Sequence, residues 1–256
     1  MKKFVNTITM VCLCTLVMGV SNSHAQEAKD HKVYLSFGGS YLNLSAAPSD
    51  DKNSSYDDEN SSSSFGGGNI TIGFMPGGNN LLSFEFGGGG GESQKIGSFE
   101  YYVITRNSSG QETNRELKTD GKISYGYSLY EAVFAYNRVF NLSDKWRFRV
   151  GPGVGMLTIS GSDSYSPSEV GGKKIEGLPD SQSESKKSLL IGVIAGCTWN
   201  FTERLFLDMN YRLSFNNELE FPDSTRTLFG HKVKVAEAKK FGSIGNRINV
   251  GLGFRF

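Results

Sequence analysis

Charged side chains that could do chemistry occur at alternate positions within apolar stretches of this sequence. Three carboxylates and five arginines follow the pattern: Glu85, Glu131, Asp208, Arg147, Arg149, Arg212, Arg247 and Arg255. Because they lie opposite the apolar residues of their segments, we expect them to point into a closed β-sheet. Such a set forms either a plug of internal salt bridges or the lining of a narrow, gated conduit. We favour the plug, because a narrow barrel is filled by its own side chains and charges buried there must pair.

Glycines on the same inward faces leave a second question open. They include Gly38, Gly73, Gly151, Gly153, Gly192, Gly196 and Gly251. They could make room for the long arginine side chains or leave a small cavity, and the sequence does not choose between these two outcomes.

Residues suited to catalysis are sparse. Beyond residue 25 the histidines are His31, just before the first expected strand, and His231, in the last long loop. A Ser-His-acid site on the outer face of a strand would need a histidine within that strand. No His/Cys spacing suits a metal ion, and Gly87–Gly91 lacks the Lys-Ser/Thr of a phosphate-binding loop. We therefore expect no enzyme activity, no cofactor and no metal site.

An acidic patch in the first long loop is the other candidate binding site. It consists of Asp50, Asp51, Asp57, Asp58 and Glu59. Its oxygens could hold Ca²⁺ or meet a cationic partner. The surrounding Ser and Asn residues favour a solvated loop.

The elements that must position the charged residues are segments in which apolar and polar residues alternate. We expect eight strands: Lys32–Asn43, about Gly68–Met75, a segment from Leu81, a segment ending near Phe140, Lys145–Ser160, Ser188–Phe201, Arg204–Phe215 and Ile244–Phe256. Each approaches or exceeds the ~9–11 residues that cross a bilayer at a tilt. The pattern predicts an all-β protein, an eight-stranded antiparallel up-and-down transmembrane β-barrel.

The connections between these segments alternate between long and short. Three are turn-like (Pro76–Asn80, Asn141–Asp144 and Thr202–Glu203), and four are long and polar (Ser45–Gly67, about Asn107–Glu116, Gly161–Lys187 and Asn216–Ser243). We expect short periplasmic turns and long extracellular loops. A count of ten strands, splitting the chain at Gly87–Gly91, is the main alternative.

Both ends of the chain agree with export to the outer membrane. Lys2 and Lys3, an apolar stretch from Ile8 to Val20 and the small residues around Ala25 predict a signal peptide over residues 1–25, with the barrel over 26–256. Asn249, Gly251, Phe254 and Phe256 resemble the C-terminal sorting signal of Gram-negative outer-membrane barrels. That resemblance implies recognition by the barrel-assembly machinery.

The architecture as a whole resembles the small outer-membrane barrels of the OmpA transmembrane domain, OmpX and opacity-protein group. Arg147–Gly155 and Leu205–Leu213 look particularly similar to the later strands of that group. The resemblance implies a bacterial outer-membrane location, contact with membrane lipid and a porin-like fold.

Composition excludes other classes of protein. The chain has 27 basic and 26 acidic side chains, so no basic field argues for nucleic acid.

We expect a non-enzymatic barrel whose loops serve envelope integrity, adhesion or recognition of an extracellular ligand or host surface. A narrow channel for small solutes is the alternative, followed by a lipid-modifying enzyme. A soluble lipocalin-like barrel would need an apolar interior, which the inward arginines contradict.

Overall fold

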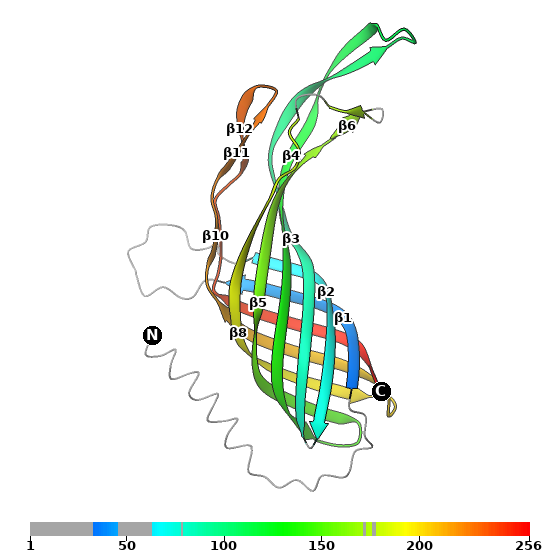
Figure 1. Ribbon diagram of the computed structural model, residues 1–256, viewed down its shortest axis with the longest axis vertical. Helices are drawn as coiled ribbons and strands as arrows, with labels where there is room; N and C mark the ends of the chain where they lie inside the picture. Colours follow the sequence, from blue (N-terminus) through cyan, green and yellow to red (C-terminus); the bar gives the residue numbers. More distant parts are fainter. Residues whose placement is uncertain (1–32, 46–62, 78, 171–172, 176–177) are drawn as a thin grey trace, which may run out of the picture.

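Eight antiparallel strands form one closed ring in the computed structural model, which describes residues 33–45, 63–77, 79–170, 173–175 and 178–256 (Figure 1). In chain order the ring strands are β1 (Val33–Ser45), β2 (Ser63–Gly77), β3 (Asn80–Arg106), β4 (Glu112–Asn141), β5 (Trp146–Ser166), β8 (Ser183–Asn200), β9 (Leu205–Asn216) and β14 (Ile244–Arg255). Strand β1 pairs with β14 and closes the ring. The predicted eight-stranded up-and-down barrel is confirmed.

Strand β3 runs without a break through the glycine segment that raised the ten-strand alternative. Gly87–Gly90 pair with β2 on one side and with β4 on the other. The ten-strand count is therefore wrong. The strand continues to Arg106, and together β3 and β4 extend well beyond the barrel as a long hairpin.

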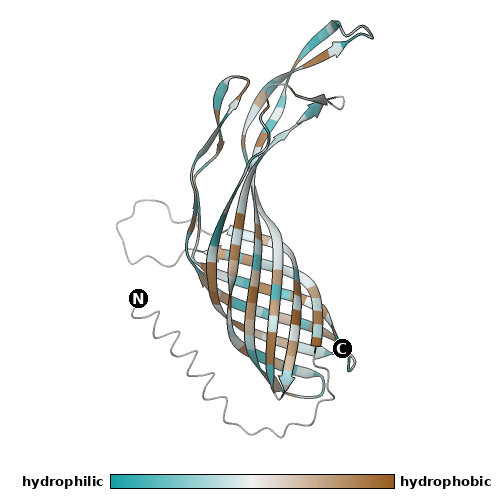
Figure 2. Ribbon diagram, in the orientation of Figure 1, coloured by the Kyte–Doolittle hydropathy of each residue, from teal (hydrophilic) through white to brown (hydrophobic). Residues whose placement is uncertain are grey.

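Side chains alternate between the two faces of the barrel wall. On β4, for example, Tyr130, Phe134 and Tyr136 are exposed outside, while Glu131 and Val133 are buried inside. Figure 2 shows the alternation of hydrophobic and hydrophilic positions along the strands. It follows the period of two that a pleated strand imposes, so the sequence assigned these faces correctly.

The two ends of the barrel differ. At the turn end, short connections join β2 to β3, β4 to β5 and β8 to β9, and the chain ends there (Figure 1). At the loop end, β3, β4 and β5 rise into a projection above the barrel (Figure 1). The predicted alternation of short turns and long loops matches this arrangement.

The long connections contain strands that the sequence analysis did not predict. Strand β6 (Glu169–Val170) pairs with β7 (Lys173–Lys174), β10 (Leu219–Phe221) with β13 (Lys239–Phe241), and β11 (Ser224–Leu228) with β12 (His231–Ala236). These strands are short and lie in polar segments that the sequence assigns to loops.

Some predictions fall on parts of the chain that the structure does not describe. The predicted signal peptide, His31 and the acidic patch at residues 50–59 lie outside the described residues. Within the described ranges, no helix is long and apolar enough to cross a membrane.

Candidate functional site

A layer of ion pairs crosses the middle of the lumen. Arg212 of β9 contacts Glu85 of β3 at 3.3 Å and also contacts Glu131 of β4. Arg247 of β14 contacts the same oxygen of Glu131 as Arg212 does. All four side chains are buried, and Arg212 is fully enclosed. Two arginines and two carboxylates from four strands therefore neutralise one another inside the barrel.

A second ion pair lies towards the turn end. Arg149 of β5 donates to Asp208 of β9 at 2.9 Å and to the Tyr34 hydroxyl at 3.3 Å. The Thr198 hydroxyl lies 3.4 Å from the other Asp208 oxygen. Asp208 thus receives hydrogen bonds from two strands, and Tyr34 connects the group to β1.

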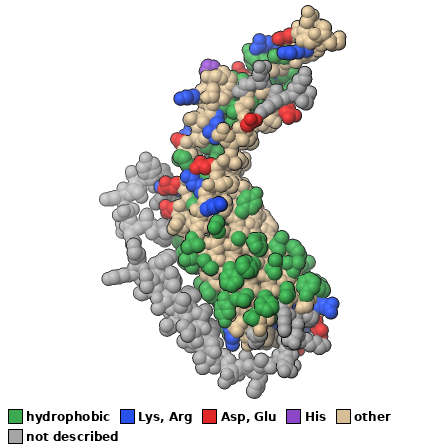
Figure 3. Space-filling view, in the orientation of Figure 1, with side chains coloured by type: hydrophobic (Ala, Val, Ile, Leu, Met, Phe, Trp, Pro, Cys, Tyr) green, Lys and Arg blue, Asp and Glu red, His purple; other side chains and the backbone are tan. Residues whose placement is uncertain are grey.

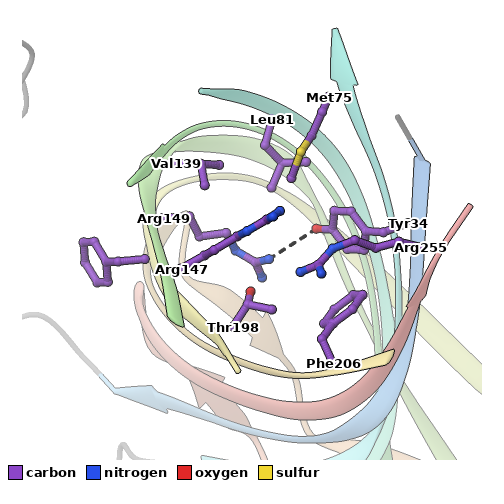
Figure 4. Close-up of a pocket in the computed structure, with 10 residues that line it drawn as sticks. Tyr34, Met75, Leu81, Val139, Arg147, Arg149, Thr198, Phe206 and Arg255 are labelled. Carbon is purple, nitrogen blue, oxygen red and sulfur yellow. Dashed lines mark hydrogen bonds between the residues drawn. The ribbon is translucent and has the colours of Figure 1, made fainter. Parts of the chain in front are cut away.

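Arg147 and Arg255 are placed differently from the other lumen arginines. Among the described residues, neither forms an ion pair with a carboxylate. Arg255 donates to the side-chain oxygen of Asn200 at 2.7 Å and to the Glu203 carbonyl at 3.4 Å. Both arginines border a small cavity at the turn end (Figure 4). The eight residues predicted as one network therefore form two ion-paired groups and two separate arginines.

The structure resolves the question that the inward glycines left open. A β-carbon on Gly196 would lie 2.8 Å from Nε of Arg149, and one on Gly73 would collide with the Tyr34 ring. Gly87 similarly lies against the guanidinium of Arg247. At these three positions the missing side chains make room for longer ones, while a small cavity remains at the turn end.

An apolar cap closes the loop end of the lumen. It is formed by Leu219 and Phe221 of β10, Ala236 of β12 and Phe241 of β13, packed on residues of the barrel strands. The centre of the Tyr127 ring lies 4.9 Å from the ring centre of Phe241 and 5.4 Å from that of Phe221. The sequence analysis missed this cap. The alternation of Leu219 and Phe221 with polar neighbours was the signal that could have indicated it.

The projection has an apolar core of its own, separate from that of the barrel. It contains Phe99, Tyr101, Ile123, Tyr165, Ile175, Leu178, Leu228 and Val235. Beside it, the buried carboxylate of Asp163 accepts hydrogen bonds from Tyr165 at 3.0 Å and from Arg226 of β11 at 3.1 Å. Burial, reinforced by the Asp163 charge, raises the pKa of the Tyr165 phenol above its ordinary value. The β11–β12 hairpin is therefore fastened to the extended barrel strands.

The outside of the barrel carries a continuous apolar belt. Its exposed members include Phe37, Ile70, Ile72, Phe84, Phe86, Phe134, Val154, Met156, Leu189, Ile191, Ile248, Val250 and Leu252. Figure 3 shows hydrophobic side chains gathered over the barrel and charged ones over the projection. A closed strand ring with an apolar outside and a charged inside is built to span a lipid bilayer. The fold is that of a small outer-membrane β-barrel.

Aromatic side chains lie at the turn end of this outer-membrane barrel, where the membrane boundary is expected. Trp146 and Trp199 stack with ring centres 5.8 Å apart, and Phe254 and Phe256 contact each other at 5.1 Å. Both tryptophans are outward-facing and partly exposed. Amphipathic rings favour the interface between lipid and water.

The residues of the expected sorting signal divide between the two faces of β14. Asn249 faces inward, accepts a hydrogen bond from Arg247 at 2.8 Å and donates one to Asn210 at 2.9 Å. Gly251 also faces the lumen, whereas Phe254 and Phe256 are exposed on the outside. Asn249 therefore has a structural contact in the folded barrel in addition to its expected role in assembly.

Other candidate chemistry is scattered. His231 begins β12 in the projection. Cys197 is a free cysteine on the outward face of β8. No group of His, Cys, Asp or Glu side chains suited to a metal ion is found among the described residues.

Solved structures of outer-membrane proteins are similar to this chain at low sequence identity. No protein-family model and no curated protein sequence matches the chain. The attachment invasion locus protein Ail of Yersinia pestis, solved with the heparin analogue sucrose octasulfate, is 13% identical over 88% of this chain and 98% of its own, with a TM-score of 0.45. Neisserial surface protein A is 10% identical over 88% and 97%, with a TM-score of 0.43. The protease OmpT of Escherichia coli is 8% identical over 92% and 99%, with a TM-score of 0.39.

Proposed function

We propose that this outer-membrane barrel is not an enzyme and acts through its extracellular projection, in adhesion or recognition at the cell surface. The observation that carries the proposal is the division of the molecule into a filled barrel and a separately packed projection. The lumen is occupied by the apolar cap, by one layer of ion pairs and by the separate Arg149–Asp208 pair. The barrel thus acts as a membrane anchor, and the working surface lies outside the membrane.

The projection has the properties of a binding surface. Its core and the Asp163–Arg226 pair hold the strands in one arrangement, which lowers the entropy lost when a partner binds. On the β3–β4 hairpin Tyr102, Ile104 and Leu117 are exposed, and Arg115 stacks over the Tyr102 ring at 4.1 Å. Aromatic residues and arginine contribute much of the energy at protein interfaces. The partner is expected to be an extracellular ligand or host surface.

Cell adhesion tests this function. Tyr102 and Leu117 are both replaced by Ser. These two residues are exposed and paired on one face of the hairpin, so their replacement leaves the packed core intact. Cells carrying this double variant should adhere to host-cell monolayers at least several-fold less than cells with the parent protein. The matched control replaces Thr105 and Thr113, exposed residues nearer the hairpin tip, with Ser. Equal adhesion by the double variant and the parent, at equal surface amounts, contradicts the proposal.

A narrow channel for small solutes remains the second candidate. The observation that favours it is the polar interior, with a cavity that opens among Arg147, Arg149 and Arg255. A channel would have to pass both the ion-pair layer and the apolar cap. Conductance of the purified protein distinguishes the two functions.

The expected processing and assembly complete the proposal. Residues 1–25 act as a cleaved signal peptide, and the barrel-assembly machinery reads the end of β14 at Phe254 and Phe256. The outward exposure of both phenylalanines supports this role, since a recognised side chain has to be accessible.

A further inference from the structure

Two arginines inside the barrel form no ion pair with a carboxylate of the described residues. Within the barrel, below the projection, five arginines and three carboxylates face the lumen. Arg212 and Arg247 are matched by Glu85 and Glu131, and Arg149 is matched by Asp208. Arg147 and Arg255, both at the turn end, are left over. Arg255 is buried and Arg147 is half-buried. An unpaired charge in a poorly hydrated space is unfavourable, so a compensating anion is expected there.

The partners of Arg255 orient its side chain without neutralising it. Asn200 and the Glu203 carbonyl accept its hydrogen bonds at 2.7 and 3.4 Å, and the Phe206 ring lies 4.5 Å from its guanidinium carbon. All three contacts are made by uncharged groups. Arg255 is only 5% exposed, so bulk water solvates its charge poorly.

The leftover charges border a cavity of suitable size. It has a volume of about 20 Å³. This is enough for one water molecule or an ion of similar size. Arg147, Arg149 and Arg255 point into the same space from β5 and β14, as Figure 4 shows, with Tyr34 and Thr198 beside them.

Hydrogen-bond donors are available around this cavity. The guanidinium of Arg149 borders the cavity, and one end of it pairs with Asp208. The Tyr34 hydroxyl accepts from Arg149, so its own proton is free to be donated. The two oxygens of Asp208 are engaged by Arg149 and Thr198.

We propose that the turn-end cavity binds one small inorganic anion, of the size of chloride, between Arg147, Arg149 and Arg255. The anion supplies negative charge beside two arginines that no described carboxylate pairs with, and it accepts hydrogen bonds from the guanidinium groups. Leu81, Met75 and Val139 form an apolar wall, which disfavours a larger, strongly hydrated oxyanion. Anion binding to the folded barrel then adds to its stability, independently of what the projection recognises.

Unfolding in urea at constant ionic strength tests the site, with the full-length protein in micelles and chloride exchanged for the bulky anion gluconate. Each tenfold rise in chloride above its dissociation constant should lower the unfolding constant by about tenfold, because the ligand binds the folded state. Arg147→Gln and Arg255→Gln should each reduce this dependence. Arg204→Gln, at an exposed arginine in the β8–β9 turn, is the matched control and should retain it. Equal stability of the parent protein in chloride and gluconate overturns the proposal, and so does an undiminished chloride response in both cavity variants.

Two further measurements keep the test decisive if the arginine variants do not fold. Met75→Glu places a carboxylate at the cavity wall and should yield a folded barrel with little chloride dependence. Crystals grown in bromide should show anomalous density between Arg147 and Arg255. A Met75→Glu protein that responds to chloride as the parent does contradicts the proposal, as does bromide density found only elsewhere. A sulfate effect as large as that of chloride overturns the assignment of anion size.

Discussion

Gly87 of β3 lies directly against the guanidinium of Arg247 of β14, so a β-carbon at position 87 would occupy the space of the arginine. Arg247 in turn pairs with Glu131 and donates to Asn249. A glycine in the wall is thus a condition for the ion-pair layer that crosses the lumen.

Replacing this glycine is expected to disturb the layer. Gly87→Ala should destabilise the barrel by about 1–3 kcal/mol, the usual cost of overpacking a filled interior. Gly90→Ala is the control on the same strand, because a β-carbon there meets no atom within 4 Å. Urea unfolding followed by tryptophan fluorescence measures both variants. Equal stability of the two variants would mean that Arg247 can move aside without lowering the free energy of unfolding.

The two central carboxylates are expected to contribute unequally. Glu131 contacts both Arg212 and Arg247, whereas Glu85 contacts Arg212. Glu131→Ala should cost about 3–5 kcal/mol, because it leaves buried arginines without their shared partner. Glu85→Ala should cost less, since Arg212 keeps Glu131. A Glu85→Ala protein that is as unstable as Glu131→Ala, in the same urea titration, contradicts this assignment.

The projection should loosen in alkali before the barrel does. Burial and the neighbouring Asp163 carboxylate raise the pKa of Tyr165 above its ordinary value of 10.0. The neutral phenol therefore stabilises the folded projection fully below that value, and this contribution is lost as the pH rises through the raised pKa. Limited proteolysis at increasing pH should cut the projection first. Tyr165→Phe, which cannot ionise, should move the onset of cleavage to higher pH, and an unchanged onset would count against this role for Tyr165.

Assembly is expected to depend on the last residue. Deleting Phe256, or replacing it with Asp, should lower the amount of heat-modifiable barrel in the outer membrane several-fold. The reason is that this outward-facing ring belongs to the expected sorting signal at the end of the closing strand. Pulse-labelling with membrane fractionation measures the effect, and Leu142→Asp, at an exposed residue of the β4–β5 turn, serves as the control. Unchanged assembly of the Phe256 variants would refute the dependence.

The barrel itself was predictable because its information is local. Period-two alternation on β4, β9 and β14 fixes which side chains face lipid, and the short turns fix the order of the strands. The same logic placed Glu85, Glu131 and Asp208 inside. Which arginine each carboxylate meets depends on strand stagger around the ring, so the pairing of Glu131 with Arg247 could not be read from the chain.

The cap and the packing of the β11–β12 hairpin on the projection were missed because their contacts join distant parts of the chain. Phe241 packs on Phe65 and Tyr127, and Arg226 reaches Asp163 across a long stretch of sequence. In each case a residue in a polar segment becomes buried only through its partner. The separate position of Arg147 and Arg255 also appears only once the carboxylates are seen to be occupied elsewhere.

Conductance across planar lipid bilayers tests most directly the claim that the barrel is filled and serves as an anchor. The purified full-length protein should give no steady unit conductance, because the apolar cap and the Glu85–Arg212–Glu131–Arg247 layer both cross the lumen. A porin of known conductance, inserted in the same bilayers, shows that channels would have been detected. Reproducible single-channel steps from the parent protein, reduced or abolished by substitutions at Glu131 or Arg212, would contradict the account and establish a conduit.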